Sequence, residues 1–349
     1  MVENDLLVPY GWTEAVADEY ASMIEDGCVP ARVIRMDRSE CDVATPTGPV
    51  RARCPRADAE VSGLCTGDWV TIDAESAVRQ LLPRRSPIMR SSVSGRSQGQ
   101  VLAANIDTVL LCTAADADVD LGRIERMLAL AWESNAQPIV VLTKADAAED
   151  IPIEDVRAVA PGASVLTVSA NSGAGLDVLA AMLDGTVALI GPSGAGKSTL
   201  ANALLGQEVF ATNAVRAADK KGRHTTVHRE LRPLPNGGTL IDTPGLRGIG
   251  LWDAAEGIEK TFSDIESLAA RCRFGDCAHN GEPGCAVLAA IDNGELPQRR
   301  FDSYRKLAKE NAWMAARTDK RLEAERKRDW RAIAKQQRQG YRERGSSRR

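Results

Sequence analysis

Between residues 105 and 245, short apolar runs alternate with longer amphipathic segments. Each run is rich in Val, Ile and Leu and has the length of a typical strand. Residues 121–135 instead repeat their apolar positions at helical spacing. Strands that alternate with helices in this way predict a parallel sheet covered by helices on both faces. The segments that contain the predicted strands are 105–112, 138–146, 164–170, 186–191 and 238–245.

The first 100 residues follow a different pattern. Residues 1–29 are predicted to form a helical extension, and residues 30–88 contain short β-branched segments separated by turn residues. Closely spaced short strands indicate a small closed barrel. The oligonucleotide-binding (OB) type is one candidate, although other small β domains share the pattern. Residues 83–100 are rich in Ser, Gly, Pro and Arg, which predicts a linker or a basic loop.

A phosphate loop follows the fourth predicted strand. The motif G-x-x-x-x-G-K-S runs from Gly191 to Ser198, between an apolar strand at 187–190 and a helix at 197–205. Its glycines allow the backbone to surround a phosphate, and successive N–H groups at the helix start attract the anion. We expect Lys197 to neutralise charge on the β- and γ-phosphates and the Ser198 hydroxyl to bind Mg²⁺. The residues predicted to contact the phosphates are Gly191, Pro192, Ser193, Gly194, Ala195, Gly196, Lys197, Ser198 and Thr199.

The tetrapeptide TKAD, from Thr143 to Asp146, indicates guanine as the base. It directly follows the apolar residues 138–142 and therefore lies at the carboxyl end of a predicted strand. Ligands of parallel sheets bind at such strand ends. The Asp146 carboxylate can accept hydrogen bonds from guanine N1–H and from the 2-amino group, neither of which adenine offers there. The stem of Lys144 can lie along the base. The next strand ends in Ser169 and Ala170, and the Ala170 N–H could reach guanine O6.

Two further segments complete the predicted nucleotide site. In DTPG, Asp242 is expected to hold a water on Mg²⁺ and the Gly245 N–H to contact the γ-phosphate. The segment 221–226, KGRHTT, resembles a mobile loop in which Thr225 or Thr226 would supply a second Mg²⁺ ligand. An ordinary polar connection is a serious alternative for that segment.

The order of these motifs is unusual. TKAD precedes the phosphate loop and DTPG comes last, whereas ordinary GTPases begin with the phosphate loop. The sequence therefore predicts a circularly permuted GTPase domain, which is tolerable because domain termini can be relocated to surface loops. In this order the chain continues from DTPG almost directly into a cysteine-rich segment.

That segment contains four residues of the types that bind zinc. Cys272, Cys277, His279 and Cys285 have the spacing C-x₄-C-x-H-x₅-C, and three thiolates with one imidazole suit tetrahedral Zn²⁺. A closed four-ligand set predicts a structural zinc ion. The two-Cys, two-His pattern of DNA-reading fingers is absent. The other five cysteines are scattered and are predicted to be buried free thiols.

Composition and charge restrict the partners. The net charge is −4, yet residues 317–349 contain 13 Lys or Arg and five Asp or Glu. A basic tail on an acidic body suggests a polyanionic partner, although a solvated, partly disordered tail has the same composition. No apolar run approaches a membrane span and the N-terminus lacks a signal-peptide pattern, so we expect a cytoplasmic protein without a membrane partner.

Together these motifs resemble the RsgA (YjeQ) family of circularly permuted GTPases. The resemblance covers roughly residues 30–310 and rests on GPSGAGKS, TKAD, GRHTT, DTPG and the Cys/His spacing. It implies an OB barrel, a permuted GTPase domain and a zinc domain. It also implies late maturation of the 30S ribosomal subunit through 16S rRNA, with GTP hydrolysed to GDP under stimulation by the subunit. Thr143 departs from the more common Asn of the guanine motif.

We therefore expect a multidomain α/β protein, monomeric, with one structural Zn²⁺ per chain and with Mg²⁺ bound together with GTP. The expected division is 1–29 extension, 30–97 OB-like barrel and linker, 98–265 permuted GTPase domain, 266–316 zinc-binding domain and 317–349 basic helical tail.

Two alternatives concern the activity. A nucleotide-gated RNA-binding module with negligible turnover would carry the same motifs. A generic P-loop ATPase is the other alternative, and the guanine motif TKAD argues against it. Many GTPases place a water-orienting Gln directly after the switch glycine, but Leu246 stands there. We therefore expect slow intrinsic hydrolysis. His224 is the candidate to position the attacking water, and an RNA contact or local packing is nearly as good a role for it.

Overall fold

Five parallel strands form the centre of the sheet in the computed structural model, which describes residues 4–23, 25–37, 39–54, 63–90, 100–210, 229–242 and 254–315. Their order is β10-β9-β8-β11-β13, and every neighbouring pair in that set is parallel. This confirms the parallel sheet predicted from the alternating apolar runs. The five strands are β8 (Thr108–Ala114), β9 (Gln137–Thr143), β10 (Ser164–Val168), β11 (Thr186–Ile190) and β13 (Thr239–Asp242).

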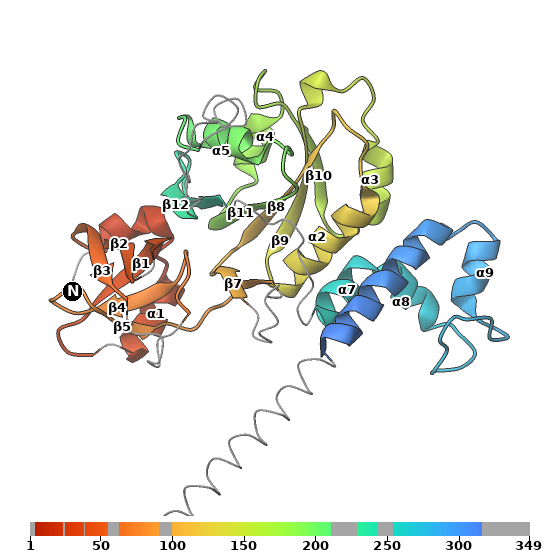
Figure 1. The fold of residues 1–349 in the computed structure, drawn as a ribbon, viewed down its shortest axis with the longest axis horizontal. Helices are drawn as coiled ribbons and strands as arrows, with labels where there is room; N and C mark the ends of the chain where they lie inside the picture. Colours follow the sequence, from red (N-terminus) through yellow and green to blue (C-terminus); the bar gives the residue numbers. More distant parts are fainter. Residues whose placement is uncertain are drawn as a thin grey trace, which may run out of the picture.

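Helices cover both faces of this sheet because its strands are apolar on both sides (Figure 1). One core lies between the sheet and α2 (Leu121–Glu133) with α3 (Ile153–Val159), and contains Ile124, Met127 and Val156. A second core lies beneath α4 (Leu176–Ala181) and α5 (Lys197–Leu205). Two short connecting elements are η2 (Ala145–Ala147) and the hairpin of β6 (Ile88–Arg90) with β7 (Gln100–Ala103).

The N-terminal strands form a five-stranded barrel. In it β1 pairs with both β2 and β4, β2 pairs with β3, and β4 pairs with β5, all antiparallel. A parallel bridge from Arg53 to Ala77 closes the circle between β3 and the start of β5. This is the strand order of an OB barrel. The strands are β1 (Val29–Met36), β2 (Glu40–Thr45), β3 (Gly48–Arg53), β4 (Trp69–Ile72) and β5 (Val78–Leu81).

The residues expected as an N-terminal extension pack onto this barrel. η1 (Asp5–Tyr10) and α1 (Glu14–Met23) place Leu7 and Val16 in a buried cluster with Trp69. The barrel is continuous with the central sheet because β12 (Glu230–Pro233) pairs antiparallel with both β13 and β1.

One buried arginine fastens the barrel to the base of the central sheet. Arg32 of β1 is 1 % exposed and donates to the Thr186 hydroxyl, 2.8 Å away, and to the carbonyl oxygen of Tyr10. Its guanidinium also lies 4.9 Å from the centre of the Trp69 ring. Burial lowers the pKa of Arg32 to about 10, which leaves it charged at neutral pH.

The C-terminal unit is helical and lies on the opposite side of the central sheet from the barrel (Figure 1). It comprises α7 (Ala255–Thr261), α8 (Ser263–Ala269), α9 (Ala286–Asp292) and a longer helix that begins at residue 298 and continues to 315. These helices share a core that includes Ile258, Phe262 and Phe301. Within the described ranges, no helix is long and apolar enough to cross a membrane.

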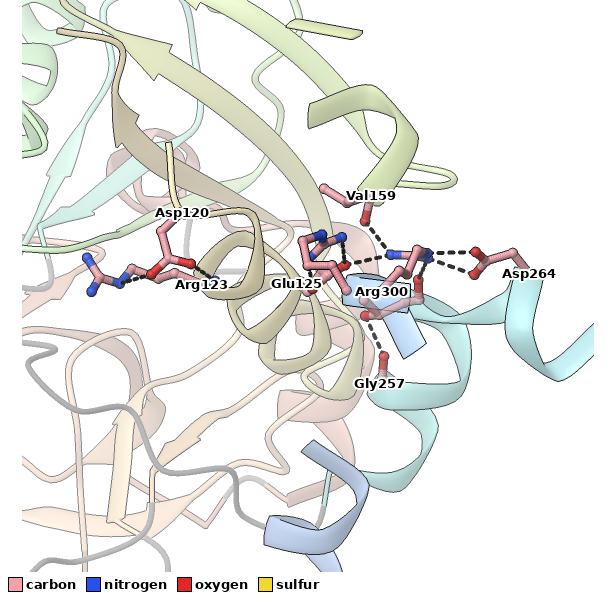
Figure 2. Close-up of polar contacts among 9 residues, drawn as sticks. Asp120, Arg123, Glu125, Val159, Gly257, Asp264 and Arg300 are labelled. Atoms are coloured by element: carbon pink, nitrogen blue, oxygen red, sulfur yellow. Dashed lines mark hydrogen bonds and ion pairs between the residues drawn. The ribbon is translucent and has the colours of Figure 1, made fainter. Parts of the chain in front are cut away.

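A buried ion-pair network joins this unit to α2 (Figure 2). Glu125 of α2 is completely buried and accepts from Arg299 at 2.9 Å and from Arg300 at 2.9 Å. Arg300 also binds Asp264 through two hydrogen bonds of 2.6 and 2.7 Å. Burial opposes the charge on Arg300, but the two carboxylates outweigh it and raise its pKa above the ordinary value.

The helices α2 and α7 also approach each other closely. Gly257 of α7 lies against the Ala129 carbonyl, where any Cβ would collide with the oxygen. Its N–H donates to the Glu133 carboxylate at 2.9 Å. The glycine therefore allows the contact that fixes the C-terminal unit on α2.

Candidate functional site

Three of the predicted nucleotide-binding segments, TKAD, the phosphate loop and the residues after the strand 164–168, meet at one edge of the central sheet. Because β8, β9, β10, β11 and β13 are parallel, their carboxyl ends all open at that edge, where ligands of α/β sheets bind. TKAD follows β9, Ser169 follows β10 and the phosphate loop follows β11. Three segments that are far apart in the sequence are thus brought together at this edge.

The phosphate loop has the backbone that its glycines permit. Gly191 has φ +155° and packs so closely on the Cys112 carbonyl of β8 that a Cβ would collide with it. Gly196 has φ +71° and is the residue before the first turn of α5, so the N-terminal N–H groups of that helix face the loop. Ser198 and Thr199 lie in this first turn and are half-buried.

Lys197 lies across the loop. Its Nζ donates to the carbonyl oxygens of Gly191 at 2.9 Å and Pro192 at 2.7 Å. The ammonium group is therefore held at the mouth of the loop, where the β- and γ-phosphates of a nucleotide would lie. Ser193 and Gly194 form the exposed tip of the loop, and Ala195 is buried beneath it.

The guanine motif is in direct contact with the phosphate loop. The buried Thr143 hydroxyl donates to the Ala195 carbonyl at 2.9 Å. The adjacent Lys144 has φ +58°, and its Nζ forms an ion pair of 2.8 Å with Asp116. Asp116 comes two residues after β8, so three strand ends contribute to this part of the site.

Asp146 is exposed at the same edge and is held by two neighbours. Hydrogen bonds from Ser169 and from Asn171, whose Nδ2 lies 3.2 Å from Asp146 Oδ2, lower the pKa of the carboxyl group. The group is therefore a carboxylate at neutral pH, which is the form that accepts from N1–H and a 2-amino group. Ser169 is itself buried, and Ala170 beside it is half-buried.

Other predicted residues are placed in part or lie outside the described residues. Asp242 ends β13 opposite Leu189 of β11, so its backbone lies beside the strand that leads into the phosphate loop. The residues outside the described ranges are His224, Thr225, Thr226, Gly245 and Leu246, together with the basic tail from 317 to 349.

The sequence did not single out Asp116 as part of the site, nor Asn171 as a partner of Asp146. A signal existed for Asp116, since a carboxylate directly after an apolar strand of a parallel sheet is placed at the binding edge. Its pairing with Lys144 depends on β8 and β9 being neighbours, which spacing alone does not reveal.

The four zinc-type residues converge in the C-terminal unit. Their ligand atoms all lie within 4.8 Å of one another, with Cys285 buried and Cys272, Cys277 and His279 half-buried. His279 Nδ1 is 3.3 Å from Cys285 Sγ and 3.7 Å from Cys272 Sγ, and the two sulfurs are 3.9 Å apart. Tetrahedral zinc with bonds of about 2.3 Å requires sulfurs roughly 3.8 Å apart, so the donor set fits the ion.

The surrounding backbone favours thiolates at this cluster. The Ala286 N–H donates to Cys272 Sγ at 3.3 Å, and the Leu288 N–H donates to Cys285 Sγ at 3.4 Å at the start of α9. Burial opposes ionisation of Cys272, but the N–H groups of Ala286 and Val287 outweigh it and lower its pKa. Zinc binds thiolates, so these contacts suit a metal site. The other five cysteines are not in disulfides. Four of them are buried, as predicted, whereas Cys54 is only half-buried.

Comparisons with known proteins agree with this geometry. The RsgA GTPase family model matches residues 81–252. The small ribosomal subunit biogenesis GTPase RsgA of Streptomyces avermitilis is 56% identical, and the alignment covers 93% of this chain and 90% of the relative. The proteins of the same name from Streptomyces coelicolor and Xanthomonas axonopodis pv. citri are 52% and 47% identical, covering 94% and 84% of this chain and 92% and 84% of the relatives.

Two solved structures share the fold. YjeQ from Thermotoga maritima superposes with a TM-score of 0.58 at 23% identity, and the match covers 80% of this chain and 97% of that one. YloQ, described as a circularly permuted GTPase, superposes with a TM-score of 0.56 at 22% identity and covers 85% of this chain and 98% of that one. The permuted arrangement read from the motif order is thus a known fold.

Proposed function

The chain belongs to the RsgA GTPase family, and we propose that it binds the 30S ribosomal subunit and assists its late maturation while it hydrolyses GTP to GDP and phosphate. The observation that carries the nucleotide part is the contact between the guanine motif and the phosphate loop at Thr143 and Ala195. The ribosomal part is supported by the names of relatives that match along nearly the whole chain. The family argues against a generic ATPase.

The nucleotide would lie across the carboxyl ends of β9, β10 and β11. In this proposal Asp146 reads the guanine edge, Ala170 approaches its O6 and Lys144 lies along its plane. The loop from Gly191 to Thr199 cradles the phosphates, and the N-terminus of α5 supports this role because the start of a helix attracts an anion.

Mg²⁺ would be held by Ser198 and Thr226, with Asp242 binding through a water, and when bound it supplies charge neutralisation between the β- and γ-phosphates. The chain's own contribution to that chemistry is Lys197, whose ammonium is already directed at the mouth of the loop. The Gly245 N–H remains a predicted contact to the γ-phosphate, and Thr225 is the alternative to Thr226 as a ligand of Mg²⁺.

One Zn²⁺ would be bound by Cys272, Cys277, His279 and Cys285. A closed set of four protein ligands leaves no open position for substrate, so the role is structural. The helical unit around it has a small core that shares Ala129 and Leu130 with α2, and the metal would add the stability that such a core lacks.

We further propose that 16S rRNA is the polyanionic partner and that the barrel and the basic tail contribute to its binding. An OB barrel is a common oligonucleotide-binding fold, and the tail carries the excess of positive charge. On this view the protein acts in the cytoplasm as a monomer.

The experiment that tests the function is single-turnover GTP hydrolysis with and without purified 30S subunits, together with co-sedimentation under GDP and a GTP analogue. We expect nucleotide-dependent binding and turnover that rises when subunits are added. The second candidate, an RNA-binding module gated by nucleotide with negligible turnover, requires the same binding without any rise in hydrolysis. Equal co-sedimentation under both nucleotides would contradict both.

A further inference from the structure

Two side chains outside the guanine and phosphate motifs hold the residues that meet the base. Asp116 pairs with Lys144 at 2.8 Å, and Asn171 donates to Asp146 at 3.2 Å. Asp116 follows β8 and Asn171 follows β10. Because β9 lies between these two strands, the two residues approach TKAD from opposite sides. The guanine motif is therefore flanked by partners whose chemistry complements it.

The amide of Asn171 acts on the direction of the Asp146 carboxylate. Asp146 is exposed, so we expect its hydrogen bonds to set the rotation of the carboxylate about the Cβ–Cγ bond. The Ser169 hydroxyl supplies one contact, and the Asn171 amide supplies another at Oδ2. A carboxylate fixed by two donors keeps its remaining lone pairs in one orientation, which is what recognition of two neighbouring N–H groups requires.

Asp116 acts on Lys144 in a different way. Lys144 has a left-handed backbone, and its Cγ lies near Gly196 of the phosphate loop. The Asp116 carboxylate holds the ammonium at the far end of that side chain. The stem between these two contacts would then be held beside the proposed position of the base, and its contact with the ring would not depend on the substituents of the purine.

We propose that Asn171 and Asp116 are positioning residues for guanine nucleotides with separable effects: Asn171 sets selectivity for the 2-amino group through Asp146, and Asp116 sets affinity for the purine ring through Lys144. The proposal rests on the assignment of TKAD as the guanine-binding motif. It adds to that assignment two residues which act on the base through other side chains.

The test compares the affinities of GDP, inosine diphosphate and xanthosine diphosphate for the full-length protein. Inosine diphosphate keeps N1–H and lacks the 2-amino group, so the ratio of GDP to inosine diphosphate affinity isolates that one contact. In Asn171→Ala we expect this ratio to fall about fivefold, because the carboxylate is free to turn away from the amino group. Asn171→Asp adds a like charge beside Asp146 and should lower the ratio of GDP to inosine diphosphate affinity further.

For Asp116→Asn we expect the affinities for GDP and for inosine diphosphate to fall by the same factor, about fivefold, so that the ratio between them is unchanged. Matched controls are Asp118→Asn, an exposed carboxylate of the same loop, and Ser172→Ala, the exposed neighbour of Asn171. Both should leave all three affinities unchanged. Thermal unfolding of each variant without nucleotide should match the parent protein, since the substituted side chains are on the surface.

Several outcomes would overturn the proposal. If Asn171→Ala leaves the ratio of GDP affinity to inosine diphosphate affinity unchanged, Asn171 does not set selectivity. If Asp116→Asn changes that ratio, the effects of the two residues are not separable. Asp146→Asn serves as the reference, because it should exchange GDP preference for xanthosine diphosphate preference. If Asp146→Asn still prefers GDP, the guanine assignment itself is wrong and the proposal falls with it. If only the Asn171 and Asp116 variants are silent, the assignment stands and these two residues are merely surface contacts.

Discussion

The Thr143 hydroxyl donates to the Ala195 carbonyl at 2.9 Å, and so joins the guanine motif to the phosphate loop across 52 positions of the chain. Both residues are buried. The hydrogen bond fixes the distance between the group that reads the base and the loop that holds the phosphates. A nucleotide must match both at once, so this distance contributes to affinity.

We therefore expect Thr143→Val to weaken GTP and GDP binding by about fivefold, the value of one lost neutral hydrogen bond. Valine keeps the branched shape, so the fold is retained, but the Ala195 carbonyl loses its donor. Thr143→Ser is the control that restores the hydroxyl and should bind nearly as well as the parent. Fluorescent nucleotide titration measures both, and equal affinities in the valine and serine variants would contradict the argument.

The buried pair of Glu125 with Arg300 is expected to control the stability of the C-terminal unit. Glu125→Gln leaves the buried Arg300 with one carboxylate fewer, and breaking such a buried pair costs about 3 kcal/mol. Glu310→Gln is the matched control, because its ion pair with Arg126 is partly exposed and worth about 1 kcal/mol at most. Urea unfolding monitored at this unit should rank the two variants in that order. Equal losses would show that burial of the network contributes nothing.

One zinc per chain is expected on metal analysis of the purified protein. Cys277→Ser should lose the ion and destabilise residues 266–300, because a small loop-rich unit folds around its metal. Cys28→Ser is a suitable control, since Cys28 is a free thiol far from the cluster in the sequence. A wild-type protein that is folded without zinc would contradict the structural role.

The basic tail predicts a dependence on salt. Deletion of residues 317–349 removes 13 Lys or Arg, and each phosphate contact that is lost removes one counterion-release contribution. We expect weaker binding to 30S subunits and a flatter slope of log affinity against log salt concentration. The same affinity and slope in the truncated protein would mean that the tail is only solvated.

The sequence predicted those parts of the site that local patterns determine. The strand–loop–helix context placed the phosphate loop between β11 and α5, with the helix beginning at Lys197 and ending at Leu205 as expected. The Cys/His spacing predicted a cluster that the fold does assemble. These features depend on residues close together in the chain, where backbone preference and spacing fix the geometry.

Contacts between distant segments could not be predicted in the same way. Glu125 and Arg300 are 175 positions apart, and their pairing depends on how α7 and the 298–315 helix pack on α2. Residues 1–29 read as an extension because their helix is only weakly amphipathic, yet Leu7 and Val16 are buried against the barrel. Only tertiary packing gives those apolar side chains a partner.

The last prediction concerns the attacking water. Leu246 follows the switch glycine and cannot hydrogen-bond to water, so intrinsic hydrolysis should be slow, with Lys197 and bound Mg²⁺ stabilising charge and no ordered nucleophile. Both Leu246 and His224 lie outside the described residues, so the role of His224 remains a sequence-based prediction. It requires that a partner orders the segment 221–226 and brings the imidazole to the water.

His224→Ala separates this role from the alternatives when GTP binding, 30S binding and 30S-stimulated turnover are measured on the same preparation. We expect the first two to be retained and stimulated turnover to fall by about 10²-fold, the usual contribution of a group that positions or deprotonates a nucleophile. His228→Ala is the control, because it removes a nearby histidine outside the 221–226 segment. A loss of 30S binding in His224→Ala would instead indicate an RNA contact. Retained turnover would transfer the role to Thr225, Thr226 or a group of the ribosome, since no other part of the mechanism requires an imidazole there.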